Sequence, residues 1–448
     1  MRARSGLIPS SSFLVLLLPL ILVSCSGDGS DAPAPQAIVP PPAARLIWST
    51  PTGLFRSQTD GNGQVTLDDA HAGIWSVIVS GTTVVYMTPQ IPSVVNHQDL
   101  WAVETNGTNR HQLVRDPQHE TYLRDVIGSW VLYDYRTGQS FQPPPPSLAS
   151  VRLDGTASRI IMDVTGEGEI WQSPNYERQI MGRAVAEFAG NYFSLLPDGT
   201  DLRQLTFYPP LPHLNNEPFT ALAGIHGAVG TAAIYATVES PSSPISAEGT
   251  PKLFAVPVLG GAVMKLGDGP EMEMLMAVIG TRVVYHRCVM KLLPNLDVTF
   301  DRCNVSSVRG NGQERVVLTA TSDINYVQGT IGQQVIIRRS RSGPTDELFS
   351  ISVKGGVETP ILSISYQNEF VIGIVKDRII LQRTTGIWSV QADGSELVQL
   401  TPDVDTFSVG AAGPFACFAR GEGLWCVPSD GSGSATKVTD QGMFVTGL

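Results

Sequence analysis

Short runs rich in Val, Ile and aromatic residues alternate with polar turns along most of the chain. Examples are TVVYMT at 83–88, WVLYDY at 130–135 and RIILQR at 378–383. Runs of this length and composition, bounded by Gly, Asp or Asn, are typical of β-strands. No stretch of useful length has the spacing of apolar positions that an amphipathic helix requires. The pattern therefore predicts an all-β protein.

A seven-residue pattern recurs nine times, in which an apolar or small residue opens a strand that ends in a turn residue and Gly. The copies are FRSQTDG (55–61), WAVETNG (101–107), ASVRLDG (149–155), FSLLPDG (193–199), FAVPVLG (254–260), SSVRGNG (306–312), FSISVKG (349–355), WSVQADG (388–394) and WCVPSDG (425–431). Asp-Gly and Asn-Gly favour a hairpin turn of type I′, which needs positive φ at both central residues. Two further strand-like runs precede most copies. Four short strands per unit of about 40 to 45 residues indicate the blade of a β-propeller.

The chain ends on one more strand of this kind. The runs FVIG at 370–373, FSVG at 407–410 and FVTG at 444–447 lie 37 residues apart, so the last opens a unit that nothing follows. The first copy begins at what should be its second strand, 45–50. We therefore expect the C-terminal strand to complete the first blade and close a single propeller of nine blades. Eight blades remain the alternative, if the copy around Ala149 or Ser306 is an insertion.

Two copies carry a more specific resemblance. They continue as DGTDLRQLT (198–206) and DGSELVQLT (393–401), and both resemble the WD40-like repeats of TolB-type β-propellers. The resemblance covers nearly all of 45–448. The Ser-Pro-Asp-Gly turn typical of that family and its separate N-terminal α/β domain are both missing. The resemblance implies the architecture and assigns no catalytic residue.

The N-terminus has the features of an export signal. Arg2 and Arg4 precede an apolar stretch, 13–23, that is too short to span a membrane alone. It runs into Leu-Val-Ser-Cys at 22–25, which resembles the lipobox of bacterial lipoproteins. The resemblance implies a signal peptide at 1–24 and a lipid on Cys25. An ordinary secretory signal with an incidental cysteine is the alternative.

The resemblance also suggests an address. Residue Ser26 takes the place of the Asp that retains lipoproteins in the inner membrane, so we expect the outer membrane of the cell envelope. The residues after Cys25, up to 44, are rich in Pro, Ala, Gly and Ser and indicate a disordered tether. The propeller domain is then 45–448.

Four cysteines besides Cys25 form two candidate disulfides. A hairpin centred between Gly421 and Glu422 would place Cys417 opposite Cys426, with Cβ atoms about 4.5 to 5.5 Å apart before closure. Cys288 and Cys303 lie symmetrically about a longer connection of the same kind. In an exported protein this arrangement predicts two cross-strand disulfides, and two pairs of reduced, buried cysteines are the alternative.

The remaining composition excludes several functions. The formal charge is −11, and loss of Arg2 and Arg4 with the signal peptide makes it −13, with no basic run to bind nucleic acid. The seven histidines show no ligand spacing, so we expect no metal or cofactor. Neither a G-x-S-x-G elbow nor an Asp-box occurs, and no catalytic residue is assigned.

Long loops indicate where a partner could bind. The second-to-third-strand loops are long at 89–98, 137–147, 239–250 and 289–300, and binding usually resides on long loops of a rigid scaffold. The blade-to-blade segments add carboxylates to the same face: Asp68, Asp69, Asp116, Glu120, Glu167, Glu169, Glu217, Asp268, Glu271 and Asp323. Simple solvation of the loop ends explains these acids equally well.

These features favour a monomeric, lipid-anchored scaffold that binds a protein or glycan of the envelope. The alternative is a hydrolase or lyase that acts on an envelope or extracellular polymer through paired carboxylates in the central funnel. A raised carboxylate pKa in the funnel would favour the enzyme, and an apolar patch would favour the scaffold.

We predict that Cys25→Ala abolishes metabolic labelling with palmitate and leaves the precursor uncleaved, because the thiol that accepts the lipid is lost. Ser26→Ala is the control and should keep the label. Labelling that persists in Cys25→Ala would contradict the lipid anchor.

Overall fold

The computed structural model describes residues 44–447 except 72, 90–97, 116–118, 138–145, 164–174, 209–218, 241–249, 293–297, 321–322, 342, 366–367 and 403–405. Contacts divide the chain into residues 1–39 and 40–448, and every described residue belongs to the second unit. The predicted signal peptide, Cys25 and the tether up to 43 lie outside the described residues. Through the described ranges the regular structure is entirely β-strand, as the sequence pattern predicted.

The described strands fall into nine groups of four, numbered here in chain order. Groups 1 to 3 contain β36 (Met443–Gly447), β1 (Arg45–Thr50), β2 (Gly53–Gln58) and β3 (Val65–Asp68); β4 (Trp75–Ser80), β5 (Thr83–Pro89), β6 (Gln98–Glu104) and β7 (His111–Val114); and β8 (His119–Ile127), β9 (Trp130–Thr137), β10 (Ser147–Arg152) and β11 (Arg159–Met162). Groups 4 to 6 contain β12 (Asn175–Ile180), β13 (Arg183–Phe188), β14 (Asn191–Leu195) and β15 (Arg203–Gln204); β16 (Phe219–Val229), β17 (Ala232–Ser240), β18 (Thr250–Pro257) and β19 (Met264–Lys265); and β20 (Met272–Ile279), β21 (Arg282–Leu292), β22 (Val298–Arg309) and β23 (Val316–Val317). Groups 7 to 9 contain β24 (Ile324–Ile331), β25 (Gln334–Ser340), β26 (Thr345–Ser352) and β27 (Thr359–Ser365); β28 (Phe370–Val375), β29 (Arg378–Arg383), β30 (Gly386–Gln391) and β31 (Val398–Thr401); and β32 (Thr406–Ala412), β33 (Phe415–Arg420), β34 (Gly423–Pro428) and β35 (Thr436–Thr439).

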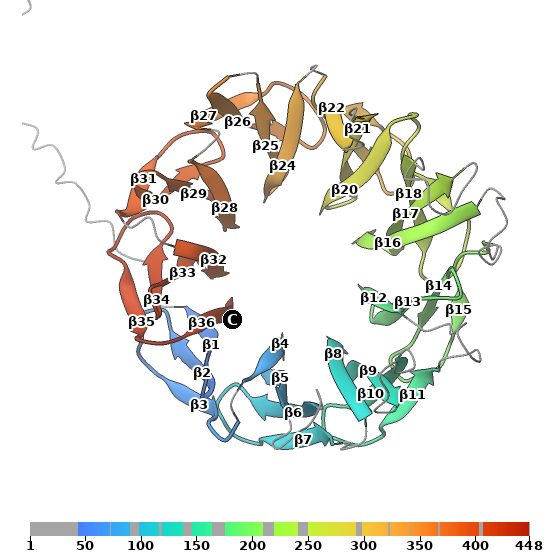
Figure 1. Ribbon diagram of the computed structural model, residues 1–448, viewed down its shortest axis with the longest axis vertical. Helices are drawn as coiled ribbons and strands as arrows, with labels where there is room; N and C mark the ends of the chain where they lie inside the picture. The colour runs from blue at the N-terminus through green and yellow to red at the C-terminus, as the bar shows by residue number, and fades with distance from the viewer. Residues whose placement is uncertain are drawn as a thin grey trace, which may run out of the picture. The chain divides into compact units, whose positions relative to one another are not determined.

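Each group is an antiparallel sheet, and Figure 1 shows the groups side by side around a common centre with their first strands innermost. Seven groups are separate four-stranded sheets. Groups 6 and 7 are joined by a single parallel bridge between Cys303 and Ile324. In group 1 the first strand comes from the other end of the chain, because β36 pairs with β1 from Leu46 opposite Gly447 to Ser49 opposite Met443. The described strands thus show the predicted use of the C-terminal strand.

Apolar side chains fill the interfaces between neighbouring groups. Val85 and Leu100 of group 2, for example, pack with Val131 and Tyr133 of group 3. Clusters of the same kind join every successive pair of groups, and one joins group 9 to group 1. Because both faces of most sheets are covered, second and third strands are almost continuously buried.

The turns between third and fourth strands differ from the predicted type I′ turns. In the turn of group 2 the Gly107 N–H donates to the Glu104 carbonyl at 2.8 Å, and Gly107 has φ of 84° whereas Asn106 does not have positive φ. Gly is thus the last residue of a type I turn that ends in a bulge. The side chain of Asn106 explains the difference, because its Oδ1 accepts from the Thr108 N–H at 2.9 Å and holds Asn106 outside the left-handed region.

The turn glycine also contacts the preceding group. A Cβ on Gly107 would lie 2.8 Å from the Thr66 carbonyl oxygen of group 1. A Cβ on Gly431 of group 9 would lie 2.3 Å from Val398 of group 8. The turn of group 1 contacts group 9 in the same manner, since a Cβ on Gly61 would lie 3.2 Å from the Lys437 carbonyl oxygen. Gly is required there by the positive φ and by this close approach.

Three groups share a polar link to the group that follows. In group 4, Arg183 donates to Ser194 Oγ at 3.2 Å and to Asp201 Oδ2 at 2.7 Å, and Ser194 Oγ donates to the Val258 carbonyl of group 5 at 2.5 Å. Equivalent links use the following residues: Arg282, Ser307, Glu314 and Val353 between groups 6 and 7, and Arg378, Ser389, Glu396 and Ser429 between groups 8 and 9. Each buried arginine is paired with a carboxylate, which offsets the cost of burying its charge.

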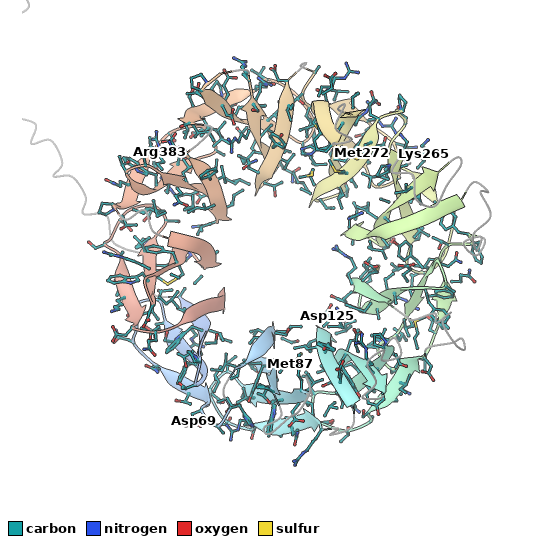
Figure 2. The ribbon with its side chains drawn as sticks, in the orientation of Figure 1. Asp69, Met87, Asp125, Lys265, Met272 and Arg383 are labelled. Atoms are coloured by element: carbon teal, nitrogen blue, oxygen red, sulfur yellow. A yellow bond between two sulfur atoms is a disulfide. The ribbon has the colours of Figure 1, made fainter. Side chains whose placement is uncertain are left out.

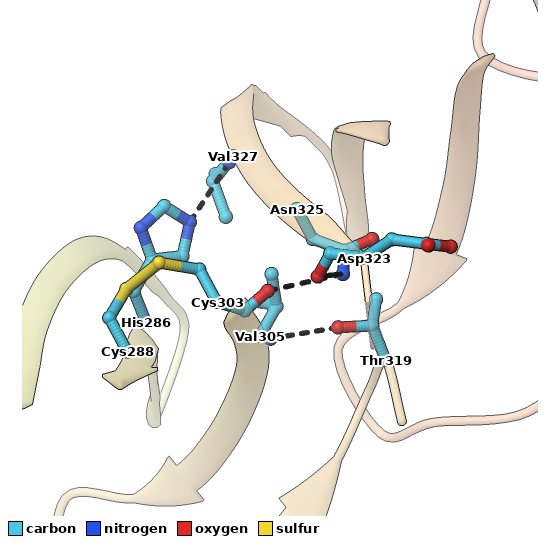
Figure 3. The surroundings of a disulfide bond; sticks show 8 residues. All are labelled: His286, Cys288, Cys303, Val305, Thr319, Asp323, Asn325 and Val327. Atoms are coloured by element: carbon cyan, nitrogen blue, oxygen red, sulfur yellow. Dashed lines mark hydrogen bonds between the residues drawn. A yellow bond between two sulfur atoms is a disulfide. The ribbon is translucent and has the colours of Figure 1, made fainter. Parts of the chain in front are cut away.

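Both predicted cysteine pairs are disulfides in the structure, Cys288–Cys303 between β21 and β22 and Cys417–Cys426 between β33 and β34. Figure 3 shows the first beside His286, whose Nε2 accepts from the Val327 N–H of group 7 at 3.1 Å. Burial lowers the pKa of His286 to about 4, so the ring stays neutral at neutral pH. The Cys288–Cys303 disulfide and the hydrogen bond between His286 and Val327 therefore both lie at the junction between groups 6 and 7.

We predict that deletion of 443–448 lowers the melting temperature by on the order of 10 °C and causes aggregation, because it removes β36 and exposes the edge of β1. Differential scanning calorimetry and light scattering measure both effects. Removal of Leu448 alone is the control and should leave melting unchanged. A six-residue truncation that melts within a degree or two of the full chain would show that β36 contributes little.

Candidate functional site

The innermost strands share an irregularity that sequence periodicity did not predict. The register of β4, β8, β12, β16, β20, β24, β28 and β32 shifts against its partner, and so does the pairing of β36 with β1. Such bulges change the direction of a side chain and are frequent beside functional sites. At six of these bulges the register of the strand pairing skips one of the following residues: Arg124, Glu177, His226, Met276, Gln328 and Ile372. We call the exposed side chains of the innermost strands the axial surface.

The axial surface is charged over groups 3 and 4. Arg124 Nε donates to the buried carboxylate of Asp134 at 2.8 Å, and Figure 2 places Asp125 at the inner end of group 3. Tyr176 Oη of group 4 donates to Asp125 Oδ2 at 2.5 Å. The hydrogen bond that Arg124 donates to Asp134 raises the pKa of Arg124, so this guanidinium stays charged. The arrangement joins groups 3 and 4 and leaves polar groups at the axial surface.

Two glutamates meet tyrosines at the interface of groups 4 and 5. We call Glu177, Glu187, Tyr192, Tyr208 and Tyr235 the acid–tyrosine cluster. Glu177 Oε2 accepts from the Ile225 N–H at 3.2 Å, and the hydroxyls of Tyr208 and Tyr235 lie 3.1 Å apart. Burial, and then the charge of Glu177, raise the pKa of Glu187. Two carboxyl groups, of which Glu187 has a raised pKa, are thus held beside phenol groups.

Tyr192 is the unsatisfied member of this cluster. Its side chain is fully buried, and among the described residues its hydroxyl oxygen has no hydrogen-bond partner of ordinary geometry. The Gly224 N–H lies near this oxygen but cannot accept the phenol proton. Burial and the charges of Glu177 and Glu187 raise the pKa of Tyr192, so its proton is retained. An unpaired buried hydroxyl costs stability, which is a common property of functional sites.

A cavity of about 320 Å³ lies next to this cluster. Its lining residues include Arg178, His226, Leu275 and Met276, which come from the innermost strands of groups 4, 5 and 6. Arg178 Nε is buried and has no partner in the described part of the chain. The cavity thus has a cationic side and an apolar side.

Over groups 6 to 8 the axial surface is apolar. Met276, Tyr326 and Phe370 are 39%, 39% and 43% exposed on three successive innermost strands, β20, β24 and β28. We call these three residues the apolar arc. Large apolar side chains exposed in succession on a rigid scaffold are typical of a binding surface.

Most of the predicted acidic residues that the structure describes form ion pairs rather than carboxylate pairs. Asp268 pairs with Arg315, Glu271 with Arg287 at 2.8 Å, Asp323 with Arg339 and Arg341, and Glu120 with Arg136. Asp69 is exposed. Asp116, Glu167, Glu169, Glu217 and most of the four long loops lie outside the described residues.

Asp68 is buried, and its hydrogen bonds indicate a role in packing rather than in binding a partner. Its buried carboxylate accepts from Tyr86 Oη at 2.6 Å, His71 Nδ1 at 2.7 Å and Arg110 Nη1 at 2.7 Å. Burial alone would raise the pKa of Asp68, but hydrogen bonds from Tyr86 and His71 lower it overall. This centre joins groups 1 and 2.

Glu177 and Glu187 were not singled out from the sequence. Glu177 follows Tyr176 in a strand of mixed polarity, and only the bulge against β13 places it near Glu187. The one available signal was Glu187 itself, a charged residue in the otherwise apolar run AVAEF of a buried second strand.

The described ranges contain neither a candidate metal-binding cluster nor a membrane-spanning helix. No group of three or more His, Cys, Asp or Glu side chains there could hold a metal ion. Nor does that part of the chain contain a helix long and apolar enough to cross a membrane.

Comparisons with known proteins show the fold alone. No protein-family model matches the chain, and neither does any curated protein. The crystal structure of a eukaryotic initiation factor aligns with a TM-score of 0.56 at 9% identity, over 91% of this chain and 97% of that one. A prolyl endopeptidase aligns with a TM-score of 0.41 at 10% identity, over 78% of this chain and 55% of its own. TolB from Acinetobacter baumannii aligns with a TM-score of 0.27 at 12% identity, over 70% of this chain and 62% of its own.

The alignment with the initiation factor fits the architecture of the described strands, four-stranded antiparallel sheets placed side by side around a common centre as in a β-propeller. The chain spans little more than half the length of the prolyl endopeptidase, so the activity of that protein says nothing about this one.

We predict that Glu187→Gln raises the melting temperature at pH 7 by roughly 1 to 3 °C and has no effect near pH 4. The pKa of Glu187 is raised in the folded state, so its favourable contribution is present below the unfolded pKa and is lost as the pH rises through the folded pKa. Thermal melts across this range measure the difference. Glu422→Gln, which changes an exposed carboxylate, is the control. Equal effects at both pH values would contradict the raised pKa.

Proposed function

We propose that the protein is a lipid-anchored β-propeller of the cell envelope that binds a protein or glycan partner through its axial surface. The apolar arc carries this proposal. Three large apolar side chains exposed in succession lose unfavourable contact with water when a partner covers them. The charged residues of groups 3 and 4 lie across the same surface and would supply orienting hydrogen bonds.

We further propose a closed ring of nine blades. Nine groups of four strands, and contacts between groups 9 and 1 of the kind seen between other neighbours, support this count. The eight-bladed alternative required one copy to be an insertion. The copies at Ala149 and Ser306 instead lie in β10 and β22, which are third strands of complete groups.

The lipid on Cys25, the outer-membrane address and the monomeric state belong to the same proposal. The lipobox-like residues 22–25, Ser26 and the Pro-rich tether support the anchor and the address. The acidic composition argues against a nucleic-acid partner.

The acid–tyrosine cluster favours a second candidate function, a hydrolase or lyase that acts on an envelope polymer. Glu187 with its raised pKa would be the proton donor, and Glu177 the base or nucleophile. Purified cell-wall polysaccharide should then gain new chain ends in the presence of the protein. Glu177→Gln and Glu187→Gln should each abolish this release while the fold is retained.

The binding proposal predicts that the triple variant Met276→Ser, Tyr326→Ser and Phe370→Ser loses most of the envelope material that the wild-type lipoprotein captures. We expect at least a tenfold loss of captured material, because truncating one central apolar side chain of an interface costs about 1 to 2 kcal/mol or more of binding free energy. Capture is measured by affinity purification from envelope extracts with mass spectrometry and glycan analysis.

The control changes three other exposed apolar residues, Leu202→Ser, Val357→Ser and Leu397→Ser, and should keep full capture. If both triple variants capture equally, the axial surface is not the binding site.

A further inference from the structure

A second set of exposed apolar residues lies away from the axial surface. We call it the apolar rim. Its seven members are Ile160, Leu202, Leu259, Val263, Val317, Val357 and Leu397, which are 42% to 89% exposed. All lie within five residues of the turn glycine between a third and a fourth strand. They come from six consecutive groups, 3 to 8, so the rim is a broad arc rather than a compact patch.

The rim lies on one face of the domain. The third-to-fourth-strand turn recurs at the same place in each group, and in every group but the fifth its glycine contacts the fourth strand of the preceding group. Strands within a group alternate in direction, so all these turns are on the same face. The second-to-third-strand turns, such as 421–422 in group 9, are therefore on the opposite face.

The N-terminal tether joins the domain at the face of the rim. Ala44 is the first described residue, and its carbonyl accepts from the Thr59 N–H at 2.8 Å while its N–H donates to Thr59 Oγ1 at 3.1 Å. Thr59 directly precedes Asp60 and Gly61, the turn of group 1. Eighteen residues separate Cys25 from Ala44. A flexible chain of that length has a root-mean-square span of about 25 Å, which would keep this face near the lipid.

Several charged residues beside the apolar rim are arranged in a way that is compatible with a lipid surface, although the protein as a whole is acidic. Asp201, Glu314 and Glu396 follow these turns, and each is already paired with a buried arginine of its own group. Arg159 and Arg203 adjoin Ile160 and Leu202 and are 44% and 40% exposed. They pair with Asp198 at 3.9 Å and Asp201 at 2.9 Å, so each would exchange a carboxylate for a lipid phosphate. Apolar side chains spaced singly, with cationic neighbours, can enter the headgroup region while the guanidinium groups meet lipid phosphates.

We propose that the apolar rim rests on the membrane to which the protein is anchored, so that the opposite face and the axial surface point away from the bilayer. This inference rests on the lipid anchor of the proposed function. It adds an orientation, because the anchor alone would let the domain tumble on its tether.

The test places a single thiol on each face of the mature lipoprotein. The four domain cysteines are in disulfides, and the lipid occupies Cys25, so a new cysteine is the one free thiol of the mature chain. Val357→Cys and Leu202→Cys report on the rim, and Glu422→Cys reports on the opposite face. Each variant carries an environment-sensitive fluorophore and is reconstituted into vesicles of phosphatidylethanolamine and phosphatidylglycerol. Quenching by nitroxide-labelled lipid is compared with quenching by aqueous iodide.

We expect lipid quenching several-fold stronger at 357 and 202 than at 422, with blue-shifted emission, and iodide quenching in the reverse order. Melting temperatures close to that of the wild type confirm that the labelled variants are folded. A lipidated protein whose rim labels stay as accessible to iodide as the label at 422 overturns the orientation and leaves the anchor intact. A protein that takes up no palmitate and does not bind the vesicles overturns both.

Discussion

The close approach of the turn glycine to the preceding group, found in every group but the fifth, is the constraint on which the rest of the structure depends. A four-stranded antiparallel sheet of this size cannot bury both of its faces alone, so it must pack against neighbours on each side. The turn fixes how closely neighbours approach, because a Cβ at Gly107, Gly394 or Gly431 would overlap the outer strand beneath it. The Arg–Ser–carboxylate links then fix the same approach by hydrogen bonds in alternate groups. Repetition of one contact around a common centre places β36 beside β1.

This packing determines where chemistry can occur. Second and third strands are buried between groups, which leaves the innermost strands, the loops and the outer turns to meet partners. Bulges in the innermost strands add residues that the register of the strand pairing skips, and these include Arg124, Glu177 and His226. The axial surface is therefore charged on one side and apolar on the other, although the sheets that support it are nearly equivalent.

Glu187 and Tyr192 are two polar residues, half-buried and fully buried respectively, that lower the stability of the folded protein. A carboxyl group with a raised pKa and a buried hydroxyl without an acceptor both lower stability at neutral pH. Group 6 has a comparable pair, because burial raises the pKa of Glu273 and the buried hydroxyl of Tyr285 has no partner among the described residues. Local conflicts of this kind are expected at functional or strained sites.

Periodicity of two and the recurrent glycine turns were enough to predict an all-β fold, the strand groups and the use of the C-terminal strand, because each depends on local chain properties and on the need to cover sheet edges. The cysteine partners followed from hairpin symmetry, since residues at equal distances from a turn lie opposite each other. The turn type was wrong, because the Asx hydrogen bond competes with the φ preference that Asn-Gly suggests. The acid–tyrosine cluster could not be predicted. A bulge inserts one residue without changing the apolar pattern, so only the tertiary structure places Glu177 beside Glu187 and against the tyrosines of the next group.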